Sequence, residues 1–258
     1  MPGTDQERSE ARPTLAWLGL LLMIVAFIGL QLNSPRSKPL TEILPPPPKE
    51  PFAVVVLDPG HGGQDSGAAK GALVEKEITL DVAHRVERAL QLGGLTPVLT
   101  RGDDSYVSLP ARAAIANAQT DCVFISIHFD DAKANATGVE TYYGARQVSL
   151  LSFSQPALPE PRNAESQALA TFIQESLVAR TQAVNRGTTP QQFFVITNVR
   201  HPAVLVEGGF LTNSVEMNKL ETPDYREAIA MAITEGVIQY RDTLQQQKTP
   251  LAIDLPDH

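Results

Sequence analysis

The chain alternates between short apolar runs and longer segments in which apolar residues recur every three or four positions. The short runs are rich in β-branched residues and predict strands. The periodic segments predict helices, because that spacing places their apolar side chains on one face. The expected strands are residues 53–57, 96–100, 122–128, 138–143, 194–196 and 203–207, and the expected helices are residues 77–92, 109–119, 164–180 and 224–241. Strands that alternate with helices indicate an α/β fold.

The first of these helices has the clearest pattern. Ile78, Val82, Val86 and Leu90 recur every four residues and form one apolar stripe. The glycine pair at residues 93–94 is typical of a helix end. We therefore expect this helix to pack on the sheet through that stripe.

The N-terminal part of the chain has a different character. Residues 15–32 are apolar apart from Gln31, and this length is enough for a helix to cross a bilayer. The run predicts a transmembrane signal anchor that follows a short N-terminal segment, residues 1–14. The alternative is secretion after signal cleavage, although no small-x-small cleavage site follows the run. Residues 33–51 are rich in proline and predict an extended linker.

The rest of the chain is expected to form one folded domain, residues 52–241, followed by a disordered tail, residues 242–258, that lacks periodicity. The whole chain has 258 residues, of which 43% are hydrophobic, so a sizeable core can form. Its net charge is −8, which argues against a nucleic-acid partner and means that an anionic partner must be held by local groups. The single cysteine, Cys122, lies in an apolar run and is expected to be buried.

Residues with catalytic chemistry cluster at the predicted strand ends. His61 follows the first strand in a glycine-rich loop, His128 ends the third, and Glu207 ends the last. Because ligands gather at the carboxyl ends of the strands in such sheets, we expect these side chains to lie at one edge. Glu75 precedes the stripe of the first helix and is a fourth candidate. Two histidines and a carboxylate are the ligand types of a catalytic zinc site, which leaves a spare carboxylate.

The other three histidines carry a weaker signal. His84 lies off the apolar stripe of its helix and is expected to be solvated. His201 precedes a proline and is read as a loop residue, while His258 lies in the tail. None of them is assigned to the metal.

At these residues the sequence resembles the zinc-dependent N-acetylmuramoyl-L-alanine amidases, peptidoglycan amidase family 3. The resemblance rests on VVVLDPGHGGQDSGA, VEKEITLDVA, LTRGDDSYVSLPARAAIANAQTDCVFISIHFDDA, GVETYYG and NRGTTPQQFFVITNVRHPAVLVEGGFLTN. It implies a mixed twisted sheet flanked by helices in a single catalytic domain. It also implies a Zn²⁺ ion held by His61, Glu75 and His128, with Glu207 as the catalytic carboxylate.

The resemblance further implies the substrate, which is the peptidoglycan amide between N-acetylmuramic acid and L-alanine of the stem peptide. The domain would then act on the outer, periplasmic or extracellular, side of the membrane. Arg101, Arg112 and Asn117 match family positions that are structural or support the site residues from behind, and no catalytic step is assigned to them. Two features depart from the family pattern. Phe129 and two aspartates follow His128, so the rim of the site is expected to differ in shape and charge. After Arg186 and Gly187 the chain reads TTPQQFFVI, where a more apolar start is common in the family, so substrate contacts there are expected to differ.

Two rival functions fit parts of the pattern. A catalytically inactive wall-binding module would keep the fold but would be expected to lack one of the four key residues. A zinc peptidase would use the same residues on a peptide bond. No motif identifies an activator protein. A helix inserted between Gly144 and Ala164 could block the site and keep the enzyme inactive, but the prolines in this link disfavour a continuous helix.

Overall fold

The computed structural model describes residues 21, 23–25, 51–130, 136–144 and 160–248. The chain divides into two compact units, residues 1–47 and residues 48–258. In the first unit only residues 21 and 23–25 are described, and they are helical and exposed. Within the described ranges no helix has both the length and the apolar character needed to span a bilayer. Most of the expected anchor, residues 15–32, and the link at residues 145–159 lie outside these ranges.

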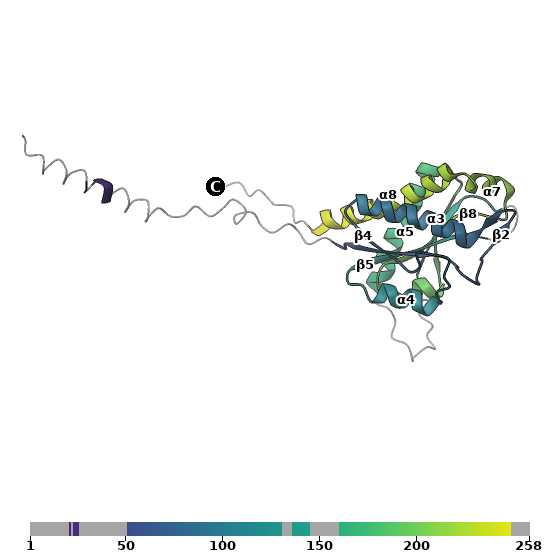
Figure 1. Ribbon diagram of the computed structural model, residues 1–258, viewed down its shortest axis with the longest axis horizontal. Helices are drawn as coiled ribbons and strands as arrows, with labels where there is room; N and C mark the ends of the chain where they lie inside the picture. The colour runs from purple at the N-terminus through teal and green to yellow at the C-terminus, as the bar shows by residue number, and fades with distance from the viewer. Residues whose placement is uncertain (1–20, 22, 26–50, 131–135, 145–159, 249–258) are drawn as a thin grey trace, which may run out of the picture. The chain divides into compact units, whose positions relative to one another are not determined.

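The second unit is built around a mixed sheet flanked by helices (Figure 1). Its six strands are arranged in the order β4-β1-β5-β8-β6-β7. The strands β4, β1, β5 and β8 run parallel, whereas β6 runs antiparallel to β8 and parallel to β7. Their bounds are β1 Val54–Pro59, β4 Thr96–Leu99, β5 Cys122–Asp130, β6 Val139–Gly144, β7 Asn185–Gln191 and β8 Ala203–Phe210. A two-stranded hairpin, β2 Ala69–Lys70 and β3 Leu73–Val74, precedes the first long helix. The predicted α/β fold and mixed sheet are confirmed.

Helices cover both faces of the sheet. The described helices of this unit are α3 Glu75–Leu92, α4 Leu109–Asn117, α5 Glu160–Thr181, α6 Phe194–Thr197, α7 Ser214–Leu220 and α8 Pro223–Lys248. The long helices α3, α5 and α8 pack on one face, and the short helices α4 and α6 pack on the other. The four predicted helices correspond to α3, α4, α5 and α8.

Helix α3 shows how the pattern produces the packing. Its stripe of Ile78, Val82, Val86 and Leu90 is buried, with exposures of 2% or less. Glu75 and Glu77 lie in the first turn, where carboxylates favour the positive end of the helix dipole. Gly93 caps the helix, as its sequence predicts, and its N–H bonds back to the carbonyl of Ala89.

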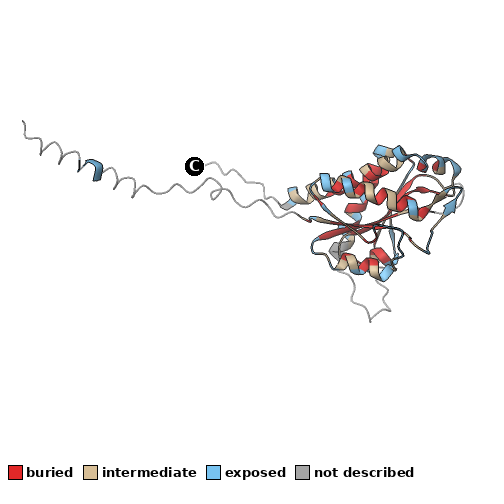
Figure 2. Ribbon diagram, in the orientation of Figure 1, coloured by how far each residue is buried: buried red, intermediate tan, exposed pale blue. Residues whose placement is uncertain are grey.

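The two faces of the sheet bury different cores (Figure 2). The larger core joins Leu57, Ile125 and Val206 of the sheet to α3, α5 and α8. The smaller core joins the alternate positions Val56, Phe124 and Leu205 to α4 and α6. Because successive side chains in a strand point to opposite faces, one set of strands supplies both cores.

Cys122 is 2% exposed at the start of β5. Burial raises the pKa of its thiol to about 12, so the thiol stays protonated and packs as an apolar group, as expected.

Two expectations about elements were wrong, and one strand was missed. Residues 194–196 form part of helix α6 rather than a strand, and this helical turn buries Val195 and Ile196 in the smaller core. The edge strand β7 was missed because its sequence, NRGTTPQ, lacks an apolar run. The helix α8 continues to Lys248, so the disordered tail does not begin at residue 242; partly buried Leu244 still packs on the core there. Residues 249–258 lie outside the described ranges.

Candidate metal centre

His61 lies in a tight loop that leaves the end of β1. Its backbone has a φ of 60°, a left-handed conformation that is uncommon for residues other than glycine. Two buried arginines hold this loop through its carbonyl groups: Arg112 donates to the oxygens of Pro59 and His61, and Arg101 donates to those of Pro59 and Gly60. These bonds fix a strained backbone that directs the imidazole toward the neighbouring strand.

His128 and Glu75 reach the same point from a strand and from a helix start. His128 lies in β5, next to β1 in the sheet. Glu75 is the first residue of α3, and its carboxylate is 6% exposed. The oxygen Oε1 of Glu75 accepts from the backbone N–H of Phe129 at 3.1 Å, and Oε2 accepts from that of Ala68 at 2.9 Å. The helix start is therefore tied to β5 directly beside His128.

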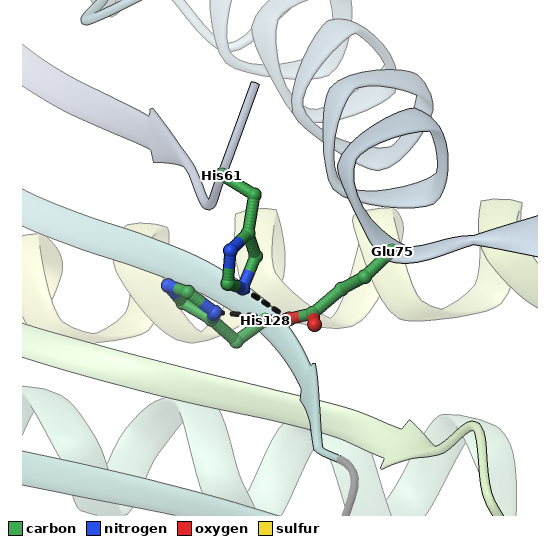
Figure 3. A group of neighbouring side chains, drawn as sticks. All are labelled: His61, Glu75 and His128. Atoms are coloured by element: carbon green, nitrogen blue, oxygen red, sulfur yellow. Dashed lines mark hydrogen bonds and ion pairs between the residues drawn. The ribbon is translucent and has the colours of Figure 1, made fainter. Parts of the chain in front are cut away.

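The three side chains converge, as Figure 3 shows. Oε1 of Glu75 lies 3.1 Å from Nε2 of His61 and 3.0 Å from Nδ1 of His128. The two imidazole rings are 4.9 Å apart between centroids and nearly perpendicular. One ligand atom from each residue lies within 4.8 Å of the others. Two imidazoles and one carboxylate fit a catalytic zinc ion, which takes three protein ligands and keeps one position open.

The electrostatics of Glu75 favour its ionised form. Burial alone would raise its pKa, but the hydrogen bonds from His128 and His61 outweigh burial and hold the pKa far below its usual range. Burial opposes protonation of His61, yet the carboxylates of Glu75 and Asp65 raise its pKa. The centre therefore holds a charged carboxylate, which is the form that binds a metal cation.

Gly60 leaves the space that the His128 ring fills. A Cβ atom at this position would lie 2.4 Å from Cε1 of His128, closer than any real contact. The glycine before His61 thus allows the two histidines to approach each other.

Glu207 lies on the strand next to His128. The two residues are register partners in the parallel strands β5 and β8, so their side chains share one face of the sheet. Glu207 is 8% exposed. The structure thus places it beside the three converging side chains, and its role as a catalytic carboxylate stays a prediction.

A cavity of about 210 Å³ opens beside the centre. It is lined by His61 and His128 together with Asp65, Tyr106, Leu109 and Val195, among others. Tyr106 is 52% exposed, and Asp65 lies 3.0 Å from Nδ1 of His61. Sequence reasoning missed both residues, although the i,i+4 spacing of His61 and Asp65 was available as a signal.

One expected feature of the rim was wrong. Phe129 was expected to shape the rim of the site, but it is fully buried in the larger core, and a Cβ atom on Gly208 would lie 2.7 Å from its ring. Because Phe129 follows His128 in the strand, its side chain points to the opposite face. The phenylalanine therefore alters the core and not the rim, while Asp131 and the side chain of Asp130 lie outside the described residues.

The remaining residues singled out from the sequence lie elsewhere. Nδ1 of His84 lies 3.0 Å from Oε2 of Glu87, and the side chain of this histidine is 37% exposed. His201 lines a separate cavity with Tyr240. Asn117 bonds to the loop at residues 198–200, so its expected structural role agrees with its contacts, as do those of Arg101 and Arg112. His258 lies outside the described ranges.

The chain is similar to known proteins of one family. Residues 55–239 match the family described as N-acetylmuramoyl-L-alanine amidase. The amidase LytC of Bacillus subtilis is 38% identical over 188 residues, which cover 72% of this chain and 35% of LytC, so the chain spans about a third of that relative. The germination-specific N-acetylmuramoyl-L-alanine amidase of Bacillus subtilis is 30% identical over 248 residues, which cover 89% of this chain and 96% of that protein. A crystal structure of an N-acetylmuramoyl-L-alanine amidase from Clostridium difficile 630 superposes with a TM-score of 0.64 at 31% identity, covering 74% of this chain and 98% of the other.

Proposed function

Because the chain belongs to the N-acetylmuramoyl-L-alanine amidase family, we propose that it cleaves the peptidoglycan amide between N-acetylmuramic acid and L-alanine with a zinc ion held by His61, Glu75 and His128. The observation that supports this most is the convergence of those three side chains on one point, with Glu207 on the adjacent strand. The donor set, its burial and the ionised state of Glu75 all fit a metal ligand shell.

Each residue then has a chemical task. A bound zinc ion supplies Lewis acidity and lowers the pKa of water toward neutrality. Glu207 accepts a proton from the attacking water and returns it to the departing alanine nitrogen, because an amine leaves poorly as an anion. Asp65 lies 3.0 Å from Nδ1 of His61 and orients that ring, as carboxylates commonly do behind histidine ligands.

The rival functions make different demands on the same residues. An inactive wall-binding module has no need for a converged set of ligands beside a carboxylate, and this set is complete. A zinc peptidase would use the same groups on a peptide bond. Only the products of the reaction distinguish that rival from an amidase.

We also propose that residues 15–32 act as a signal anchor and hold the enzyme against the wall on the outer side of the membrane. The basis is their apolar sequence, followed by a proline-rich linker. The alternative is a secreted enzyme. Sequencing the N-terminus of the mature chain from membrane and culture fractions separates the two, since cleavage would remove Met1 and the apolar run.

The test of the proposed function uses the full chain and purified peptidoglycan, with and without a chelator. We expect the chelator to abolish cleavage and added zinc to restore it. Mass spectrometry of the products should show stem peptides that carry a free L-alanine amine. Fragments cut within the peptide would favour the peptidase, and unchanged peptidoglycan would favour the inactive module.

A further inference from the structure

A second carboxylate lies beside Glu207 and is held by an arginine. Glu140 in β6 is the register partner of Glu207 in β8, so the two side chains share the face that carries His128. Oε2 of Glu140 lies 3.1 Å from Nε of Arg186, and Oε1 accepts from the hydroxyl of Thr189 at 3.0 Å. Both Arg186 and Thr189 belong to the edge strand β7.

Arg186 is fixed in place but remains accessible. Its guanidinium carbon lies 4.9 Å from the centre of the Phe210 ring, at the end of β8. Its side chain is 37% exposed, whereas that of Glu140 is 10% exposed. The hydrogen bond to Glu140 uses Nε, whereas the planar guanidinium also carries two Nη groups that can bind a carboxylate in a two-pronged fashion.

The position of Arg186 suits a substrate that extends from the metal centre. Three strand spacings, roughly 14 Å, separate β5 with His128 from β7 with Arg186. An extended peptide advances roughly 3.5 Å per residue, and the arginine side chain spans part of the gap. Carboxylates on the second and third residues of a stem peptide are therefore within reach.

The charges on this face favour a cation as the group that binds a carboxylate. Glu207 and Glu140 adjoin each other, and the chain as a whole has a net charge of −8. A carboxylate that passes these groups is repelled unless a local cation attracts it. Arg186 is a cation that borders Glu140 and Phe210 on this side of the sheet.

We propose that Arg186, oriented by Glu140 and Phe210, binds a free carboxylate of the stem peptide and thereby sets substrate preference. The proposal rests on the proposed amidase function and adds a specificity-determining residue to it. Arg186 is here a binding residue and takes no part in proton transfer. The competing explanation is that the Arg186–Glu140 pair only joins the edge strand to the sheet.

The test compares three forms of a muramyl tripeptide: one with free carboxylates, one amidated at the second residue and one amidated at the third. Hydrolysis by the full, zinc-loaded chain gives kcat and KM for each form. Calorimetric binding of the three matching free peptides gives Kd without relying on turnover. The variants are Arg186→Gln and Arg186→Lys, and Arg180→Gln is the matched control, because it breaks a surface pair with Glu235 on other elements.

We expect amidation at one of the two positions to raise KM and Kd about tenfold in the wild type and so to identify the bound carboxylate. Arg186→Gln should raise both values about tenfold for the free form and leave those for the sensitive amidated form unchanged, with kcat nearly constant. Arg186→Lys should retain part of the preference, and Arg180→Gln all of it.

Equal values for the three forms in the wild type would overturn the proposal without use of any variant. Equal losses on free and amidated forms in Arg186→Gln would also overturn it and would indicate a structural role. If the peptides bind with the expected preference but no form is hydrolysed, the carboxylate site stands and the proposed amidase activity fails.

Discussion

The two faces of the central sheet use the same strands for different purposes. On the face covered by α3, α5 and α8, the inward positions of β1, β5 and β8 are apolar throughout, as in Leu57, Ile125 and Val206. On the opposite face the apolar positions give way toward the carboxyl ends of the strands to Asp58 in β1 and Glu207 in β8. One face therefore stabilises the fold, and the other changes along its length from core to site.

On this second face, a buried polar network lies between the apolar core and the site. The carboxylate of Asp58 accepts from Arg112 at 2.8 Å, from Thr100 at 2.6 Å and from Ser126 at 2.8 Å. Arg112 in turn holds the carbonyl groups of the His61 loop. Because each group has partners, a charged layer can be buried next to the metal centre.

The largest expected effect comes from breaking this network. Asp58→Ala leaves the Arg112 guanidinium buried without its carboxylate, which should lower the free energy of unfolding by about 3–5 kcal/mol. The matched control is Asp81→Ala, which removes a half-exposed carboxylate paired with Arg85 and Arg226. Exposed pairs contribute about 0–1 kcal/mol each. Urea denaturation gives the free energy of unfolding of both variants. Similar losses of stability would show that the buried network contributes no more than an exposed ion pair.

On the apolar face, Ile125→Ala should cost about 3 kcal/mol, within the usual 2–5 kcal/mol for such a change, because the side chain is fully buried. The folded variant should still bind one zinc ion per chain, since Ile125 points away from His128 and its partners. Denaturation and metal analysis of the same sample test this separation. A loss of zinc together with stability would contradict the division between the two faces.

A smaller change should act on the metal centre alone. In Gly60→Ala the new methyl group would meet the His128 ring at 2.4 Å, so the ring must move. We expect zinc affinity to fall about 10–100-fold, the usual range for disturbing groups behind metal ligands. Gly102→Ala is the control, because a Cβ atom there meets nothing within 4 Å. Competition with a chromogenic chelator reports both affinities, and equal values would show that the ring has room to adjust.

The sequence predicts the apolar face better than the site face. The α3 stripe follows the helical period, and β1, β5 and β8 begin with continuous apolar runs, so these elements are confirmed within a few residues. The strand β7 could not be found that way, because an edge strand with a polar sequence carries no period-2 signal. The apolar FVI segment was taken for a strand because periodicity does not distinguish a short strand from a single helical turn.

For the site, chemistry at strand ends selected His61, His128 and Glu207, and a carboxylate at a helix start added Glu75. What the sequence could not show is how these residues are held. The bond from the Phe129 N–H to Glu75 joins residues 54 positions apart. The contact of Arg186 with Glu140 depends on the strand β7 that was not predicted. Such contacts arise from the order of strands in the sheet, which local patterns do not contain.

The central claim is that three side chains hold the metal and a fourth moves the proton. The most direct test is to measure zinc content and peptidoglycan hydrolysis together in Glu207→Gln and His61→Ala. We predict that Glu207→Gln keeps close to one zinc ion per chain and loses most hydrolysis, whereas His61→Ala loses both. Equal loss of zinc in the two variants would contradict the account, because Glu207 would then be a ligand and the proposed division of roles would be wrong.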